Sequence, residues 1–251
     1  MGGAPSTLPN ISDITLQTAS NANIDGNTVH TTSVPATARN TSTHLRPNEK
    51  EIIKLMLPVY YLHVDASPDE IKIASDSWEL ILNDKSPEFL KRKENDPTFQ
   101  YGSCMIFFYD SFYTRLFDMH PICRPLFLNG IKIQGRFLVK MLSLSLSVYQ
   151  DPVKFDHALL KLAEGHYHGG VKSVEYGIVG EVLFWALRNV LGAAYTFELH
   201  TIWVKIYSRM LRTIVPAAVA FELKGETEKQ LVRPHRRDSH LFPMGSLAKP
   251  E

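Results

Sequence analysis

The sequence predicts an all-α protein, and three observations support this fold class. From residue 48 onward, apolar side chains recur every three or four residues in one segment after another. That spacing is typical of helices with one buried face. Two segments open with helix-start signals, at Ser67-Pro68 and at Asp151-Pro152. The stretch that alternates like a strand, residues 142–148, continues a segment of helical spacing with no turn signal between them.

Composition narrows the classes of function. The 251 residues are enough for one large or two small domains. A net charge of +1 gives no global field that would attract nucleic acid. Cys104 and Cys123 lie in apolar segments, which favours buried free thiols in a reducing compartment over a disulfide. No apolar run reaches the ~18 residues of a membrane span, and no signal-peptide core is recognisable. We therefore expect a cytoplasmic protein.

The N-terminal arm, residues 1–47, is rich in Ser, Thr, Asn, Ala and Pro and has no helical or strand period. We expect it to be disordered. Its first residues fit the loose N-myristoylation pattern, with Gly2 as the acceptor and Ser6 four residues on. The pattern is common by chance, so membrane binding is expected only if Gly2 is modified. Residues 48–66 are predicted to hold a short pre-helix.

A capping box at Ser67 and Glu70 begins the first long helix. Its apolar face consists of Ile71, Ala74, Trp78, Ile81 and Leu82. Residues 83–100 are polar, and a helical fragment and a loop both remain open there. An aromatic helix is predicted over 105–119, followed by a short turn over 122–128. Residues 131–149 are interpreted as a helix rather than a strand.

Three further helices are predicted. The first follows Asp151-Pro152 and carries Phe155, Leu159, Leu162 and His166 on one face. The second covers about 174–191, and the third covers 197–215, where Pro216 bends or ends it. The main domain is predicted over residues 67–223. The charged tail, 224–251, is interpreted as a solvated appendage, with binding of phosphate or anionic lipid as the alternative.

Two blocks of sequence resemble the globin family, in particular single-domain globins and the haem domain of flavohaemoglobins. One is the corner Leu162–Glu181, LAEGHYHGGVKSVEYGIVGE, and the other is Phe112–Phe127, FYTRLFDMHPICRPLF. The resemblance extends over about residues 67–216. It implies the globin fold, a 3-over-3 helical sandwich, and haem b (iron protoporphyrin IX) as the cofactor. It also implies that His166 is the iron ligand, and that Tyr113 and Gln134 face the bound gas.

The resemblance implies further haem contacts. Leu138, Val179 and Leu183 would line the gas cavity, and Tyr176 would pack beneath the haem near His166. Phe127, Phe137, Phe155 and Leu162 would surround the porphyrin. The chain departs from the family in having only six residues between Phe127 and Gln134. It also has no acid at Val215–Ala218, where flavohaemoglobins have a carboxylate.

The residue types at these positions suggest how iron and a bound gas would be held. A neutral His166 would bind iron through one ring nitrogen and orient itself through the other, by donating to a carbonyl near Leu162. Tyr113 and Gln134 are hydrogen-bond donors suited to dioxygen, which carries partial negative charge. An ordinary core tyrosine and a surface glutamine are the alternatives for these two residues.

Three functions are therefore open. The first is reversible binding of dioxygen, nitric oxide or carbon monoxide for storage, sensing or scavenging, with retention too tight for bulk transport. The second is nitric oxide dioxygenase activity, which would need a separate reductase because no flavin domain follows Pro216. The third is a haem-free interaction module, against which His166 and the polar distal pair argue. An enzymatic role is considered less favoured than gas binding.

Overall fold

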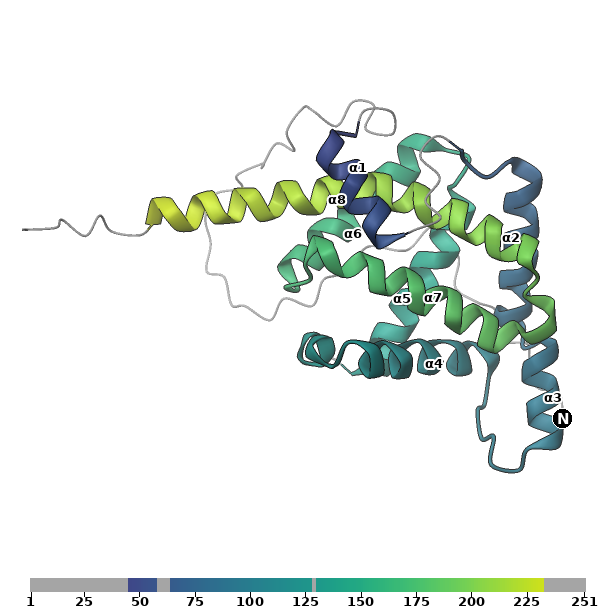
Figure 1. The fold of residues 1–251 in the computed structure, drawn as a ribbon. Coiled ribbons are helices and arrows are strands. Elements are labelled where there is room, and N and C mark those ends of the chain that lie inside the picture. Colours follow the sequence, from purple (N-terminus) through teal and green to yellow (C-terminus); the bar gives the residue numbers. More distant parts are fainter. Residues whose placement is uncertain (1–44, 58–63, 128–129, 233–251) are drawn as a thin grey trace, which may run out of the picture. The chain divides into compact units, whose positions relative to one another are not determined.

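The computed structural model describes residues 45–57, 64–127 and 130–232, with side chains described up to residue 226. These ranges are helical and contain no strand, so the all-α prediction is confirmed. The α-helices are α1 (Pro47–Met56), α2 (Pro68–Leu82), α3 (Pro87–Asn95), α4 (Cys104–Met119), α5 (Ile131–Ser147), α6 (Pro152–His168), α7 (Tyr176–Leu191) and α8 (Phe197–Val232) (Figure 1). Within the described ranges, short 3-10 helices are present as η2 (Pro121–Leu126), η3 (Ser173–Glu175) and η4 (Gly192–Ala194).

Most of the predicted N-terminal arm, including Gly2, lies outside the described residues, as does the tail beyond residue 232. The disorder, the myristoylation and the tail's anion binding therefore stay predictions. The predicted domain limits at residues 67 and 223 stay predictions too.

The predicted helix starts are present. The Ser67 hydroxyl oxygen accepts a hydrogen bond from the Glu70 backbone N–H at 3.2 Å, and the Glu70 carboxylate accepts one from the Ser67 N–H at 2.8 Å. This is the reciprocal capping box that the sequence predicts. The Asp151 carboxylate caps α6 in the same way, at 3.1 Å from the Lys154 N–H. In the polar stretch 83–100, Ser86 caps α3, so the helical alternative is the correct one there.

The alternating stretch belongs to α5 up to Ser147, and Val148 is the C-cap of that helix, as the helical spacing before it predicts. Leu142 faces the core, while Ser143 meets α2, where its hydroxyl oxygen accepts a hydrogen bond from the Trp78 indole N–H at 2.8 Å. A small polar side chain at this position lets the two helices approach closely. It also provides a hydrogen-bond acceptor for the N–H of a buried indole. The alternating pattern of this stretch therefore reflects the packing of a helix and does not indicate a strand.

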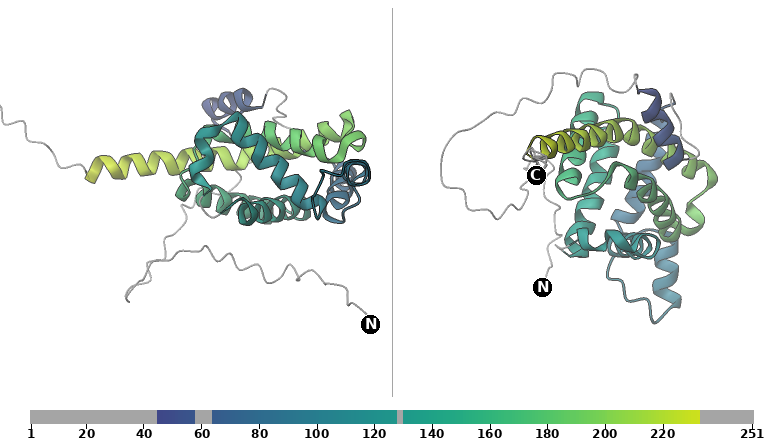
Figure 2. Two further views of the ribbon diagram at one scale, coloured as in Figure 1. Left: turned by 90° about the horizontal axis from the view of Figure 1, so that it is seen from below. Right: turned by 60° about the vertical axis from the view of Figure 1, so that its left-hand side comes forward.

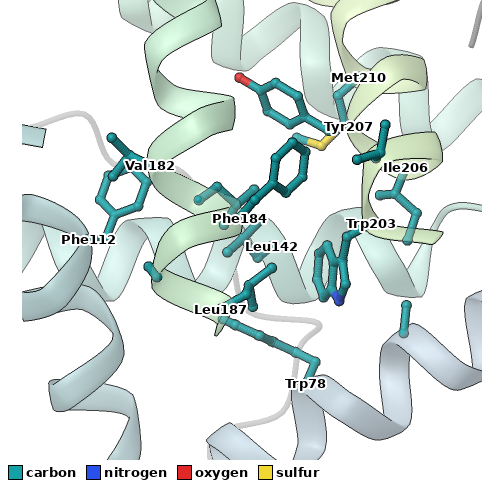
Figure 3. Packing of buried hydrophobic residues seen from close by; sticks show 14 of the residues in the cluster. Trp78, Phe112, Leu142, Val182, Phe184, Leu187, Trp203, Ile206, Tyr207 and Met210 are labelled. Atoms are coloured by element: carbon teal, nitrogen blue, oxygen red, sulfur yellow. The ribbon is translucent and has the colours of Figure 1, made fainter. Parts of the chain in front are cut away.

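The core lies where α7 packs against α4 and where α6 packs against α8 (Figures 1 and 2). Figure 3 shows the indole rings of Trp78 and Trp203 near Leu187 of α7. The two indoles make an edge contact with ring centroids 6.2 Å apart. At Gly180, a Cβ atom would lie 2.5 Å from the Tyr207 ring, so glycine permits the close crossing of α7 and α8.

Residues Ser173–Ala194, which include α7, are long and apolar enough to cross a membrane by length and composition. The expectation that no segment reaches this length is therefore wrong. The hydropathy has another physical origin in the described structure, because Val182, Ala186 and Leu187 are completely enclosed by neighbouring helices. A helix that is buried on most of its faces has the composition of a membrane span.

Helix α8 continues through Pro216 to Val232, well past the expected boundary at residue 215. A proline inside a helix costs roughly 3 kcal/mol, because it lacks an N–H and crowds the preceding turn. Burial offsets that cost here, since Val215 and Ala218 on either side are almost fully buried. Good helix formers follow, and Phe221 packs on Tyr167 of α6. Figures 1 and 2 show the end of α8 running on beyond α6.

Candidate functional site

His166 lies on the last turn of α6, immediately before a sharp corner. The backbone N–H groups of Gly170 and Val171 donate to the carbonyls of Tyr167 and His166, at 3.0 and 2.9 Å. Gly170 has φ = +87°, a conformation that residues with a side chain rarely adopt. The glycine pair noted in the sequence therefore ends the helix directly after the histidine. His168, the other histidine of this turn, is exposed, whereas His166 is half-buried.

The imidazole of His166 is oriented by a tyrosine. Its Nδ1 lies 3.1 Å from the hydroxyl oxygen of Tyr176, and the two ring centroids are 5.6 Å apart. Burial lowers the pKa of His166 to about 4, while the charge of Glu175 acts in the opposite direction. The ring is consequently neutral at pH 7. In the tautomer in which Nδ1 donates to the Tyr176 oxygen, Nε2 carries the lone pair that a metal needs.

The recorded partner of Nδ1 is thus the Tyr176 hydroxyl, rather than the carbonyl near Leu162 that we expected. Tyr176 can serve in this role because its own position is firmly held. Its side chain is buried, and its carbonyl accepts a hydrogen bond from the Tyr207 hydroxyl at 2.5 Å. The orienting group therefore comes from the start of α7, across the corner, and not from the preceding turn of α6.

Two carboxylates lie near Tyr176, and the sequence analysis missed both. The Glu222 carboxylate accepts hydrogen bonds from the Ser173 N–H at 2.7 Å and from the Ser173 hydroxyl at 3.0 Å. The pKa of Tyr176 is raised, first by burial and then by the charges of Glu222 and Glu175. The stretch Val215–Ala218 contains no acid, as the sequence shows, but α8 supplies one further along, at Glu222. Because α8 continues through Pro216, an acid beyond the aligned stretch reaches the corner.

On the other side of the predicted slot, α4 presents Tyr113. The side chain is buried, and its ring meets Phe127 edge-on with centroids 5.2 Å apart. Burial raises the pKa of the Tyr113 hydroxyl, so it stays protonated and can donate. The recorded contacts of Tyr113 within the described residues are with aromatic rings, and none is a hydrogen bond of its hydroxyl. The structure therefore brings Tyr113 and Phe127 together and leaves the Tyr113 hydroxyl available as a donor.

Gln134 and Leu138, on the first two turns of α5, are both half-buried. The helices α5 and α4 cross closely beside Gln134, because a Cβ atom at Gly135 would lie 2.4 Å from the ring of Tyr109. Tyr109 and Tyr113 are four residues apart and share one face of α4. The crossing thus brings the turn with Gln134 to the face of α4 that carries Tyr113. No direct hydrogen bond joins these two residues in the described part of the chain.

The other predicted haem contacts differ in their surroundings. Leu162 and Val179 are half-buried and pack on the core, and Leu183 is buried. Phe137 is 46% exposed. Phe155 is fully buried, edge-on to Tyr149 at 5.3 Å, with the Arg209 guanidinium 4.4 Å from its ring.

Phe155 lies eleven residues before His166, which corresponds to about 16 Å along a helix. The contacts of Phe155 therefore serve the packing of α6 on α8, and its role beside a porphyrin has no support from them.

The side chains near His166 limit the kind of metal that this site could bind. Within the described residues, no group of three or more His, Cys, Asp or Glu side chains could bind a free metal ion. A lone imidazole such as His166 would therefore suit a metal that already has most of its ligands, as in haem.

A surface cavity of about 330 Å³ lies elsewhere, between α3 and α7, and none of its lining residues is a predicted haem contact. That lining consists of Glu88, Arg92, Trp185, Arg188, Asn189 and Gly192.

Comparison with known proteins agrees with this arrangement. A family model described as "Globin" matches residues 110–214. A flavohemoprotein of Bordetella pertussis is 31% identical over 108 residues, which are 41% of this chain and 27% of that protein. The chain thus spans about a quarter of the length of that relative. Neuroglobin of Danio rerio is 30% identical over 110 residues, covering 38% of this chain and 69% of neuroglobin.

A solved structure supports the fold. An engineered carbene transferase, derived from a proposed nitric oxide dioxygenase of Rhodothermus marinus, superimposes with a TM-score of 0.50 at 19% identity. The match covers 64% of this chain and 99% of that protein. At this identity the likeness concerns the fold alone.

Proposed function

The chain belongs to the globin family, and from this premise we propose that it binds haem b through His166 and reversibly holds dioxygen or another diatomic gas. The observation that carries the proposal is the state of His166. Its ring is half-buried and neutral, and its Nδ1 lies 3.1 Å from the Tyr176 hydroxyl, so in the tautomer with Nδ1 protonated Nε2 would be the iron ligand. When bound, haem supplies the iron on which a diatomic gas sits.

The residues of the chain would then select and retain the gas. The Tyr113 side chain is buried and its hydroxyl stays protonated, so the hydroxyl can donate a hydrogen bond to a ligand oxygen. The Gln134 amide would supply a second donor from α5. A bond to an acceptor that carries charge contributes roughly 1.5–3 kcal/mol, and about 1.4 kcal/mol corresponds to a decade in off-rate. Such retention suits storage, sensing or scavenging better than bulk transport.

One observation favours a second function, nitric oxide dioxygenase activity with a separate reductase. Tyr176 contacts His166, and the charges of Glu222 and Glu175 act on Tyr176. Negative charge near the hydrogen-bond partner of an axial histidine makes that ligand more electron-donating. The acid on α8 removes one argument that the sequence raised against this chemistry. Turnover of nitric oxide with a supplied reductant would distinguish the enzyme from a gas-binding protein.

The third function, a haem-free interaction module, is tested by the same experiment as the first. Purified protein is titrated with hemin, and the Soret band is followed for the wild type and for His166→Ala. The matched control is His168→Ala, an exposed histidine two residues away. We expect a band that His168→Ala retains and His166→Ala loses or shifts. An unchanged band in His166→Ala would refute the assignment, and no band in any variant would favour the haem-free module. Cytoplasmic location is part of the same proposal.

A further inference from the structure

The C-terminal part of α8 lies against the last turn of α6, the turn that carries His166. The Tyr167 ring stacks on Phe221 with centroids 5.7 Å apart and an interplanar angle of 22°. One turn further along α8, a Cβ atom at Gly225 would lie only 1.9 Å from the Tyr167 hydroxyl oxygen. A methyl group at residue 225 would therefore force the tyrosine hydroxyl to move from its place against the α8 backbone.

The same turn of α8 also holds the far side of the corner. Glu222, next to Phe221, accepts both hydrogen bonds from Ser173. Tyr167 precedes the Gly169-Gly170 corner and Ser173 follows it. Phe221, Glu222 and Gly225, which we call the α8 clamp, thus contact the chain on both sides of the corner.

The corner needs such support because its own backbone is permissive. Two successive glycines end α6, and glycine costs more conformational entropy to order than any other residue. Neighbouring residues on a helix point about 100° apart, so Tyr167 and His166 project from different sides of α6. The Tyr176 hydroxyl holds the turn at His166, and the α8 clamp holds it at Tyr167. Together these contacts define the rotation of the last turn about the axis of α6.

We propose that the α8 clamp is a positioning device for His166, which orients the imidazole through Tyr167 and thereby sets how long a gas is retained. The proposal rests on the proposed function in one respect, that His166 is the haem ligand. It gives a role to the stretch of α8 beyond Pro216, the residue at which the sequence predicts that the last helix bends or ends. Any movement of this stretch would be transmitted to His166 through the neighbouring residue Tyr167, whose ring stacks on Phe221.

The test introduces a steric clash between residues 225 and 167 with one substitution and removes it with a second. Gly225→Ala places a methyl group against the Tyr167 hydroxyl, whereas Tyr167→Phe removes that hydroxyl and keeps the stack on Phe221. The double variant Tyr167→Phe/Gly225→Ala should therefore recover most of what Gly225→Ala loses, because the nearest remaining ring atom, Cζ, lies 3.2 Å from the position of the new methyl group. Gly165→Ala on α6 is the matched control, because a Cβ atom there meets nothing within 4 Å. By propensity alone, alanine within a helix stabilises relative to glycine, so a loss in Gly225→Ala isolates the clash.

The first readout is amide hydrogen exchange of residues 164–171 in the haem-free protein. In Gly225→Ala we expect exchange about tenfold faster, equivalent to about 1.4 kcal/mol of local stability. The double variant should return most of the way to the wild-type rate, and Gly165→Ala should show no acceleration. The second readout, on haem-loaded protein, is the iron–histidine stretching band together with the dioxygen off-rate. Both should shift in Gly225→Ala and return in the double variant.

Unchanged exchange in Gly225→Ala would overturn the inference, as would a defect that Tyr167→Phe fails to relieve. Accelerated exchange with an unmoved iron–histidine band would also overturn it, because the clamp would then be merely structural. Failure of the proposed function has a different signature, the absence of a Soret band. The exchange experiment needs no haem and distinguishes the two failures.

Discussion

Replacing Tyr113 by Phe removes one buried oxygen atom and tests the distal assignment directly. The ring would stay in place, because its contacts with Phe112, Phe117 and Phe127 are made by carbon atoms. None of the recorded contacts of Tyr113 is a hydrogen bond of its hydroxyl, so its loss breaks no hydrogen bond among the described residues. We therefore expect the stability of the haem-free protein to stay the same or to rise slightly.

The effect on gas retention should be large by comparison. A hydrogen bond to an acceptor bearing charge is worth roughly 1.5–3 kcal/mol. At about 1.4 kcal/mol per decade, Tyr113→Phe should speed dioxygen release by about 10- to 100-fold. Carbon monoxide carries less negative charge on its oxygen, so its off-rate should change much less. Flash photolysis and stopped-flow replacement of dioxygen by carbon monoxide would measure both rates.

The matched control is Tyr195→Phe. Tyr195 is also a buried tyrosine with a raised pKa, but its hydroxyl lies 3.1 Å from His200 Nδ1. Its removal should lower stability and leave the dioxygen off-rate unchanged. A Tyr113→Phe variant with a wild-type dioxygen off-rate would refute the distal role. Equal acceleration in both variants would indicate a general loosening of the fold instead.

Three further predictions concern the haem-free fold. Gly135→Ala should destabilise it by about 1–3 kcal/mol, because the new methyl group overpacks a buried helix crossing, whereas Gly165→Ala should stabilise it slightly in the same thermal melts. Glu222→Ala should cost about 1–3 kcal/mol by leaving the N–H and hydroxyl of Ser173 without their acceptor, and urea unfolding would show it. His200 has a pKa lowered chiefly by burial, so below its unfolded pKa near 6.5 the unfolded state binds more protons and stability falls as pH decreases. The decline between pH 7 and 5 should be shallower in His200→Gln, and an identical decline would contradict this reasoning.

Local signals in the sequence predicted the helix starts and the buried faces well. The Ser67–Glu70 capping box is visible because both partners lie within one turn. The alternating stretch in α5 was assigned correctly because helical spacing precedes it. The corner after His166 was recognisable from its two glycines, one of which has positive φ.

What the sequence could not show depends on contacts between distant residues. Glu222 and Ser173 are 49 positions apart, and their pairing requires α8 to continue through Pro216. Sequence alone predicts that the helix ends at this proline, because proline destabilises a helix interior. Burial of the neighbouring residues Val215 and Ala218 offsets that cost, and it cannot be recognised from the local sequence. The orienting partner of His166 was missed for a similar reason. Tyr176 was assigned to packing, and its hydroxyl reaches Nδ1 only because Tyr207 holds its backbone from another helix.

The position of α7 within the chain has a consequence for biosynthesis. This helix leaves the ribosome before α8, yet α8 provides Tyr207, which lies against Gly180 and binds the carbonyl of Tyr176. Until α8 has been translated, the nascent chain therefore exposes its most apolar segment, one that resembles a membrane span in length and composition. Exposed apolar surface on incomplete chains is what chaperones bind and what drives aggregation. Chains truncated before residue 197 should therefore depend on chaperones, and release of the completed α8 would be the step that ends this dependence.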